Sequence, residues 1–316
     1  MTVLRRAGIR GPWFGARSRM ASCWVLLALA TATVAGQNSA NAKTAALQQA
    51  LERRLQGIAE SVDAVMGYEV VDLTTGARFG RLQDEVFPTA STIKLAILYE
   101  LFKQTDEGKL KLEEVRPLDR KYVVGGSGVL HELASPVMPL RDYATLMIVL
   151  SDNTATNVII DRVGMQNVTS RMAALGLKQT KLRRRMIDIE AARRGDENVS
   201  TPSEVAKLLG IMYRGEGLSP ESHRGLLETL KKSKSSPMRT TIPETVDVAN
   251  KPGTLDGVAV DGGIVYVEGR PYIFAAMLTY LGNASSGDAT IGAASRAVYE
   301  YFSRLATGSE YGRTIR

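Results

Sequence analysis

Two apolar hairpins, one near each end of the chain, restrict the possible folds more than any other sequence feature. The first comprises residues 65–72 and 77–80, joined by a Thr-Thr-Gly turn, and the second comprises residues 262–267 and 272–281. Between them, residues 91–214 show mostly helical spacing of apolar side chains. Hairpin strands pair antiparallel. The sequence therefore predicts an α/β fold, an antiparallel sheet lobe with an inserted all-helical lobe.

Helices are expected beside the predicted sheet. Residues 43–59 repeat apolar side chains at helical spacing, and a final helix is expected over residues 289–305. Within the helical lobe, Thr201 can cap a helix that begins with Pro202, and Glu204 would complete a capping box. The sheet lobe is therefore expected to be flanked by helices.

The first 42 residues are predicted to be a secretory leader. Residues 1–35 hold five arginines and no acid, and they include an apolar run over residues 21–35. That run is shorter than the roughly 20 residues a membrane-spanning helix needs, and a basic start before a short apolar core is typical of an export signal. We therefore expect a boundary at residue 42, one folded domain over residues 43–316, and a periplasmic or secreted location. An uncleaved anchor is the alternative.

Composition argues against several classes of function. The five arginines of the leader supply most of the net charge of +7, so the remaining chain has no basic excess for nucleic acid. The one cysteine, Cys23, lies in the leader, and the two histidines, His131 and His223, are too few for a histidine-rich metal site. We expect no nucleic-acid partner, no metal and no cofactor, and nothing requires more than a monomer.

A hydroxyl and an amine begin an apolar helix near residue 91. Lys94 stands inside the apolar run of that helix, and a buried lysine is rare without a partner or a chemical task. Ser91 lies three residues earlier, on the same helix face. Desolvation lowers the pKa of an amine, which lets the amine act as a base. A lysine reaching solvent and a capping serine are the structural alternative.

Two further polar groups stand where apolar segments end. Ser151-Asp152-Asn153 separates two apolar helical segments, where such side chains either find partners or cap a helix. Lys251-Pro252-Gly253-Thr254 follows a short predicted strand over residues 246–250. A lysine and a glycine that permits close approach can hold an anionic substrate beside the backbone.

Ser91-x-x-Lys94, Ser151-Asp152-Asn153 and Lys251-Pro252-Gly253 occur in the order of the three motifs of class A β-lactamases and related penicillin-recognising serine enzymes. The flanking segments FPTASTIKLAIL, LMIVLSDNTATN and NKPGTLDGVAVDGGIV are also similar to that family. The resemblance covers roughly residues 43–310. It implies a β-lactamase/transpeptidase-like fold, with a small-molecule β-lactam or a peptidoglycan-peptide-like compound as substrate.

The resemblance also implies roles for the residues of the first two motifs. Ser91 would attack the β-lactam carbonyl and become acylated. Lys94 would help to deprotonate Ser91, and Ser151 would relay a proton to the leaving nitrogen. Asn153 would hydrogen-bond the substrate side chain and Lys94.

The third motif would bind the substrate. Lys251 would supply positive charge for the substrate carboxylate and steady Ser151, and Gly253 would allow close approach. The backbone N–H groups of Ser91 and Thr254 would form the oxyanion hole. Pro252 replaces the usual hydroxyl residue, so carboxylate recognition is expected to be weaker unless Thr254 substitutes. A residue without an N–H also suits an edge strand.

The loop over residues 183–200 departs from the family. Class A enzymes carry Glu-x-x-Leu-Asn there, and its glutamate activates the deacylating water, whereas this chain lacks the motif. Asp188, between Ile187 and Ile189, is the favoured replacement, because apolar neighbours would hold the carboxylate inward and raise its pKa. Glu190 is the second candidate. The structural alternative is that both acids pair with neighbouring arginines.

Three hypotheses follow from these residues. The first is a class A type serine β-lactamase that works through an acyl-enzyme on Ser91. The second is a related serine esterase or D-Ala-D-Ala carboxypeptidase with slow deacylation. The third is a non-catalytic binder of cell-wall peptides, against which the complete set of Ser91, Lys94, Ser151 and Lys251 argues.

Overall fold

The computed structural model describes residues 23–309 and 311–315. Within them, five strands form one antiparallel sheet in the order β2-β1-β9-β8-β7. The strand bounds are β1 Val65–Asp72, β2 Arg78–Arg81, β7 Val248–Leu255, β8 Val258–Val265 and β9 Tyr272–Thr279. The two predicted hairpins therefore meet in one sheet, because β1 pairs with β9 along its whole length.

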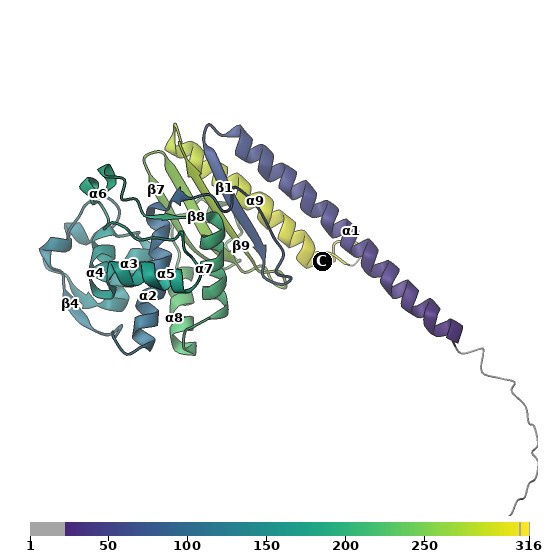
Figure 1. Cartoon of the computed structure of the whole chain (residues 1–316), viewed down its shortest axis with the longest axis horizontal. Helices are drawn as coiled ribbons and strands as arrows, with labels where there is room; N and C mark the ends of the chain where they lie inside the picture. The colour runs from purple at the N-terminus through teal and green to yellow at the C-terminus, as the bar shows by residue number, and fades with distance from the viewer. Residues whose placement is uncertain (1–22, 310, 316) are drawn as a thin grey trace, which may run out of the picture.

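The first and last helices lie together on one face of the sheet (Figure 1). They are α1 Cys23–Ser61 and α9 Ala284–Thr307. Leu51 and Leu55 of α1 and Phe302 of α9 pack into a core beneath that face. Both helices begin earlier than predicted, at Cys23 rather than 43 and at Ala284 rather than 289.

The inserted helical lobe covers the other side of the sheet (Figure 1). Its helices are α2 Lys94–Asp106, α3 Leu140–Val149, α4 Asn153–Val163, α5 Met165–Ala174, α6 Ile189–Arg193, α7 Pro202–Arg214 and α8 Pro220–Lys231. Two small strand pairs interrupt it, β3 Phe87–Pro88 with β6 Val199–Ser200 and β4 Val115–Pro117 with β5 Val137–Pro139. The 3₁₀ helices of the described residues are η1 Ala90–Ile93, η2 Arg120–Tyr122, η3 Leu130–Glu132 and, beside α9, η4 Arg239–Thr241. The inserted lobe was predicted to be all-helical. It is mostly helical and also contains the two small strand pairs.

The start of α7 confirms one half of the predicted capping box. The hydroxyl of Thr201 accepts a hydrogen bond from the backbone N–H of Glu204 at 3.1 Å, and Pro202 follows the cap. The carboxylate of Glu204 does not return to Thr201. It accepts instead from the backbone of Gln179 and Thr180, whose N–H groups need an acceptor at that turn.

The predicted leader is described only in part. Residues 1–22 lie outside the described residues, and the remainder up to residue 42 belongs to α1. Among the residues that the structure describes, no helix combines the length and the apolar character needed to cross a membrane. The boundary at residue 42 stays a prediction.

Candidate active site

The Ser91 segment packs directly on the edge strand β7. Ser91 lies in η1, and Lys94 is the first residue of α2. A Cβ atom added to Gly253 of β7 would stand 2.5 Å from the Ser91 nitrogen, so only glycine permits this approach. Thr92 fixes the same contact, because its hydroxyl donates to the Lys251 carbonyl at 3.0 Å. Strand β7, which contains the third motif, therefore packs against the segment that contains the first motif.

The hydroxyl of Ser151 is the centre of the polar contacts. Ser151 Oγ donates to Ser91 Oγ at 2.9 Å. Lys94 Nζ donates to Ser151 Oγ at 3.0 Å, and Lys251 Nζ donates to the same oxygen at 3.1 Å. Lys94 also contacts the Ser151 carbonyl at 2.7 Å and Asn153 Oδ1 at 3.1 Å. Two amines and the candidate nucleophile therefore meet at one serine.

Both lysines are buried, and burial lowers the pKa of each amine. Burial lowers the pKa of Lys94 well below its usual value, and the neighbouring charge of Lys251 lowers it further. Burial lowers the pKa of Lys251 to about 7, although the carboxylate of Asp261 opposes the shift. Burial therefore favours the neutral amine of Lys94, the form that can accept a proton, while Lys251 changes charge near neutral pH.

Asp152, the middle residue of the second motif, holds the backbone around the site in place. It is fully buried, and its carboxylate accepts from the backbone N–H groups of Val129, Leu130 and Ala155 at 2.7, 2.9 and 2.8 Å. A Cβ on Gly128, whose φ is +107°, would stand 2.2 Å from this carboxylate. Asp152 thus caps α4 and holds the preceding glycine-rich loop beside the site.

Two of the residues with a left-handed backbone lie at the serines of the site. Ala90, immediately before Ser91, has φ 44°, and Ser151 itself has φ 53°. Non-glycine residues adopt this left-handed region rarely, and such strain tends to occur at functional sites.

Two cavities open on Ser91. The larger measures about 460 Å³, and the smaller, about 200 Å³, lies toward the loop of residues 183–200. Both are lined by Ser91, Ser127 and Thr254. The larger is further lined by Ser151, Ser235, Ser236, Pro237, Thr240, Lys251, Pro252, Gly253, Asp288 and Ala289. The smaller is further lined by Ala90, Gly126, Asn153, Arg184, Met186, Ile187, Glu197, Asn198 and Leu255.

The structure brings together all the predicted site residues except Asp188. Asp188 is the N-cap of α6, and its carboxylate accepts from the Ala191 backbone N–H at 3.0 Å. It lines neither cavity, and its neighbours Ile187 and Ile189 are exposed. The expected inward orientation is therefore corrected: an aspartate before a short helix satisfies the helix N–H groups first. Glu190 is also exposed and pairs with Arg193.

Sequence analysis missed several residues that line the cavities. Glu197 and Arg184 lie at the two ends of the loop and face the smaller cavity. Asp288 lines the larger cavity from α9, whose start was placed too late in the sequence. Asn283, which caps α9, was the available signal for that start. Among the described residues, no group of three or more His, Cys, Asp or Glu side chains could hold a metal ion.

Known proteins are similar to this chain in sequence and fold. A family model described as the beta-lactamase enzyme family matches residues 49–302. The chain is 25% identical over 209 residues to beta-lactamase CARB-3 of Pseudomonas aeruginosa, which covers 65% of this chain and 73% of that protein. Among solved structures, a beta-lactamase from Sphaerobacter thermophilus is 28% identical with a TM-score of 0.72, covering 80% of this chain and 96% of its own.

A second solved relative is a mutant of PBP-A in an acyl-enzyme complex with penicillin-G. It is 29% identical with a TM-score of 0.74, covering 81% of this chain and 96% of its own. These likenesses agree with the sheet, the inserted helices and the three motifs at one cleft. The chain belongs to the beta-lactamase enzyme family of penicillin-recognising serine enzymes.

Proposed function

We propose that the protein is a serine β-lactamase of class A type, which hydrolyses the β-lactam amide through an acyl-enzyme on Ser91. The observation that carries the proposal is the shared contact of Ser91, Lys94 and Lys251 with the Ser151 hydroxyl. A nucleophile within hydrogen-bond reach of a base relay is the arrangement that acyl transfer requires.

Acylation uses this relay in both directions. A hydroxyl both donates and accepts, so Ser151 can pass the Ser91 proton to the neutral amine of Lys94. Ser91 Oγ then attacks the β-lactam carbonyl carbon. As the C–N bond breaks, Ser151 donates its proton to the leaving nitrogen and is reprotonated by Lys94.

Binding of the substrate falls to the larger cavity. Protonated Lys251 attracts a substrate carboxylate, and the Thr254 hydroxyl is the substitute for the one that Pro252 lacks. Ser91 and Thr254 line both cavities, and their backbone N–H groups would stabilise the oxyanion. Asn153, from the smaller cavity, would bind the substrate side chain.

The alternative function is a serine esterase or D-Ala-D-Ala carboxypeptidase with slow deacylation. It is favoured by the missing Glu-x-x-Leu-Asn motif. It is also favoured by the likeness to PBP-A, of which a mutant has been solved in an acyl-enzyme complex with penicillin-G. Both functions share the acylation step and differ in how fast water releases the product.

We also propose that the protein is exported and acts as a monomer on small molecules. The basic, then apolar, first 35 residues support export. The steps described above use side chains, backbone groups and water, so they require no metal or cofactor.

Covalent labelling tests the proposal. Ser91→Ala should abolish the mass increase that benzylpenicillin produces, because the attacking oxygen is gone. Ser127→Ala is the matched control, since Ser127 lines both cavities but is outside the Ser151 contacts. It should still be labelled. An adduct of equal yield on Ser91→Ala would refute the mechanism.

A further inference from the structure

The smaller cavity joins Ser91 to the loop of residues 183–200. Its volume of about 200 Å³ exceeds the roughly 30 Å³ that one water molecule occupies. Among the described residues, Glu197 is the single carboxylic acid that lines it. A water held in this cavity would share it with Ser91 and with a carboxylic acid.

One carboxylate oxygen of Glu197 forms an ion pair, and the other can accept a hydrogen bond. Oε2 accepts from Arg184 Nη2 at 3.0 Å. Oε1 has no hydrogen-bond partner among the residues that the structure describes, and 31% of the side chain is exposed. An ion pair that uses one oxygen fixes the carboxylate while leaving the second oxygen free to accept from a water.

Arg184 offers a second polar group to the same cavity. It is only 9% exposed, and its Nε–H group is buried without a hydrogen-bond partner. Buried donors are normally satisfied by protein or by ordered water. Arg184 and Glu197 therefore line one cavity as an ion pair, and a cavity with such a polar lining is a suitable site for a bound water.

Asn198 ties this pair to the nucleophile. Its side chain accepts from the backbone N–H groups of Arg183 and Arg184 at 2.8 and 3.0 Å. The backbone carbonyl of Asn198 accepts from the backbone N–H of Thr89 at 2.9 Å and from the Thr89 hydroxyl at 3.0 Å. Thr89 lies two residues before Ser91, so the position of Glu197 is fixed relative to the serine.

We propose that Glu197 is the general base for deacylation, with Arg184 as its positioning residue. The inference rests on the proposed acyl-enzyme at Ser91. Glu197 accepts a proton from water as the water oxygen bonds to the ester carbonyl carbon. The tetrahedral intermediate then collapses, the bond from carbon to Ser91 Oγ breaks, and the proton returns to Oγ. The products are free enzyme and the ring-opened acid.

Separate rates for acylation and deacylation test the assignment. Glu197→Gln keeps the shape but cannot accept the proton, so the benzylpenicillin adduct should form at the wild-type rate and persist about 10²–10⁴ times longer. Glu190→Gln is the matched control, because it makes the same change on an exposed acid of the same loop. Its adduct should decay like the wild type, as should that of Asp188→Asn. Glu197→Asp should recover part of the deacylation rate.

Several outcomes would overturn the assignment. Adduct decay in Glu197→Gln at the wild-type rate would remove Glu197 from the chemistry. Equal loss of acylation in Glu197→Gln and Arg184→Gln would assign the pair to the fold of the loop alone. A wild-type adduct that never decays would leave acylation intact but remove the deacylating base. A wild type that forms no adduct and consumes no substrate, or whose adduct never decays, would contradict the proposed β-lactamase function itself.

Discussion

Two buried lysines share one serine hydroxyl in this site. Lys94 and Lys251 both donate to Ser151, and both have a lowered pKa because burial penalises their charged forms. Burying an amine makes it a usable base near neutral pH. The two amines can therefore have different roles. Lys94 would accept a proton, and protonated Lys251 would attract the substrate carboxylate.

The charge of Lys251 should appear in the pH dependence of catalysis. Its pKa of about 7 means that the charged form, which binds a carboxylate, is lost as the pH rises through 7. We expect kcat/KM for benzylpenicillin to fall over that range. The methyl ester of the same substrate lacks the carboxylate and should show a smaller fall. Equal pH profiles for acid and ester would contradict the role of Lys251.

Ser91, Lys94, Ser151 and Lys251 were predicted as a group because their three motifs occur in the order known for the family. The structure places these four side chains in contact. The base on the loop was different. Whether Asp188 or Glu197 faces Ser91 depends on which carboxylate a helix N-terminus captures, and that is decided by the loop conformation.

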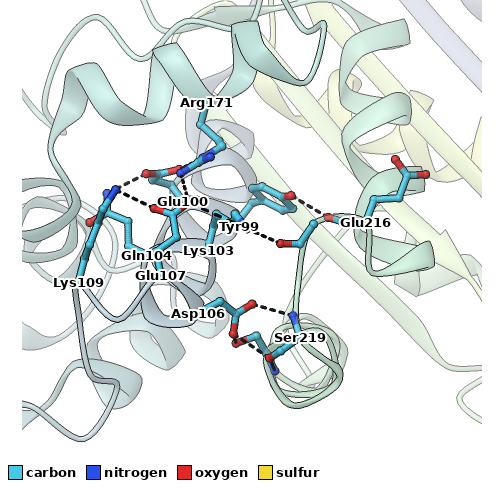
Figure 2. Close-up of polar contacts among 12 residues, drawn as sticks. Tyr99, Glu100, Lys103, Gln104, Asp106, Glu107, Lys109, Arg171, Glu216 and Ser219 are labelled. Atoms are coloured by element: carbon cyan, nitrogen blue, oxygen red, sulfur yellow. Dashed lines mark hydrogen bonds and ion pairs between the residues drawn. The ribbon is translucent and has the colours of Figure 1, made fainter.

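Helix α2 is the element that places Lys94, and charged side chains hold its middle and its far end (Figure 2). Glu100, 2% exposed, accepts from Arg171 of α5 at 2.8 Å and from Gln104 at 2.7 Å. Asp106 accepts from the backbone and hydroxyl of Ser219, next to α8, both at 2.7 Å. These contacts fix α2 against its neighbours.

Breaking the Glu100 contact should destabilise the fold. Glu100→Gln weakens a hydrogen-bonded ion pair in a buried place, and we expect it to lower the free energy of unfolding by about 2 kcal/mol in urea denaturation. Glu300→Gln is the control, since its pair with Arg54 is largely exposed and should be worth less than about 1 kcal/mol. Equal losses in the two variants would refute this ranking.

The contact between β7 and η1 should control acylation. Gly253→Ala puts a methyl group 2.5 Å from the Ser91 nitrogen, so strand and serine must separate. We expect kcat/KM to fall by about 10²-fold, as when an oxyanion-hole donor is displaced. Gly57→Ala, where a Cβ meets nothing within 4 Å, should leave kcat/KM unchanged. Wild-type activity in Gly253→Ala would show that this close approach is not needed.

At the scale of the whole molecule, the hairpins could be predicted, whereas the starts of the first and last helices could not. Strand β1 matched its predicted bounds because an apolar, strand-forming segment ends directly before a turn there. Strand β7 extends through Pro252 to Leu255, which a proline-containing sequence does not suggest. It is tolerated because β7 is an edge strand, as expected for a residue without an N–H.

The buried lysines should also affect the stability of the whole fold. Their pKa values are lowered on folding, so above pH 7 the unfolded chain binds protons that the folded chain has released. Stability should therefore rise with pH from about 7 toward the unfolded lysine pKa of about 10.4. In Lys251→Met, the rise in melting temperature between pH 7 and 9 should be smaller than in the wild type. An identical rise would contradict the lowered pKa of Lys251.

The most direct measurement follows the intact mass of the wild-type protein over time with excess benzylpenicillin. The account predicts one adduct on Ser91 that appears, accompanies hydrolysis of the penicillin, and disappears when the substrate is consumed. Hydrolysis without any adduct would contradict the acyl-enzyme mechanism. An adduct that remains after the free penicillin is removed would contradict β-lactamase turnover and favour the carboxypeptidase-like alternative.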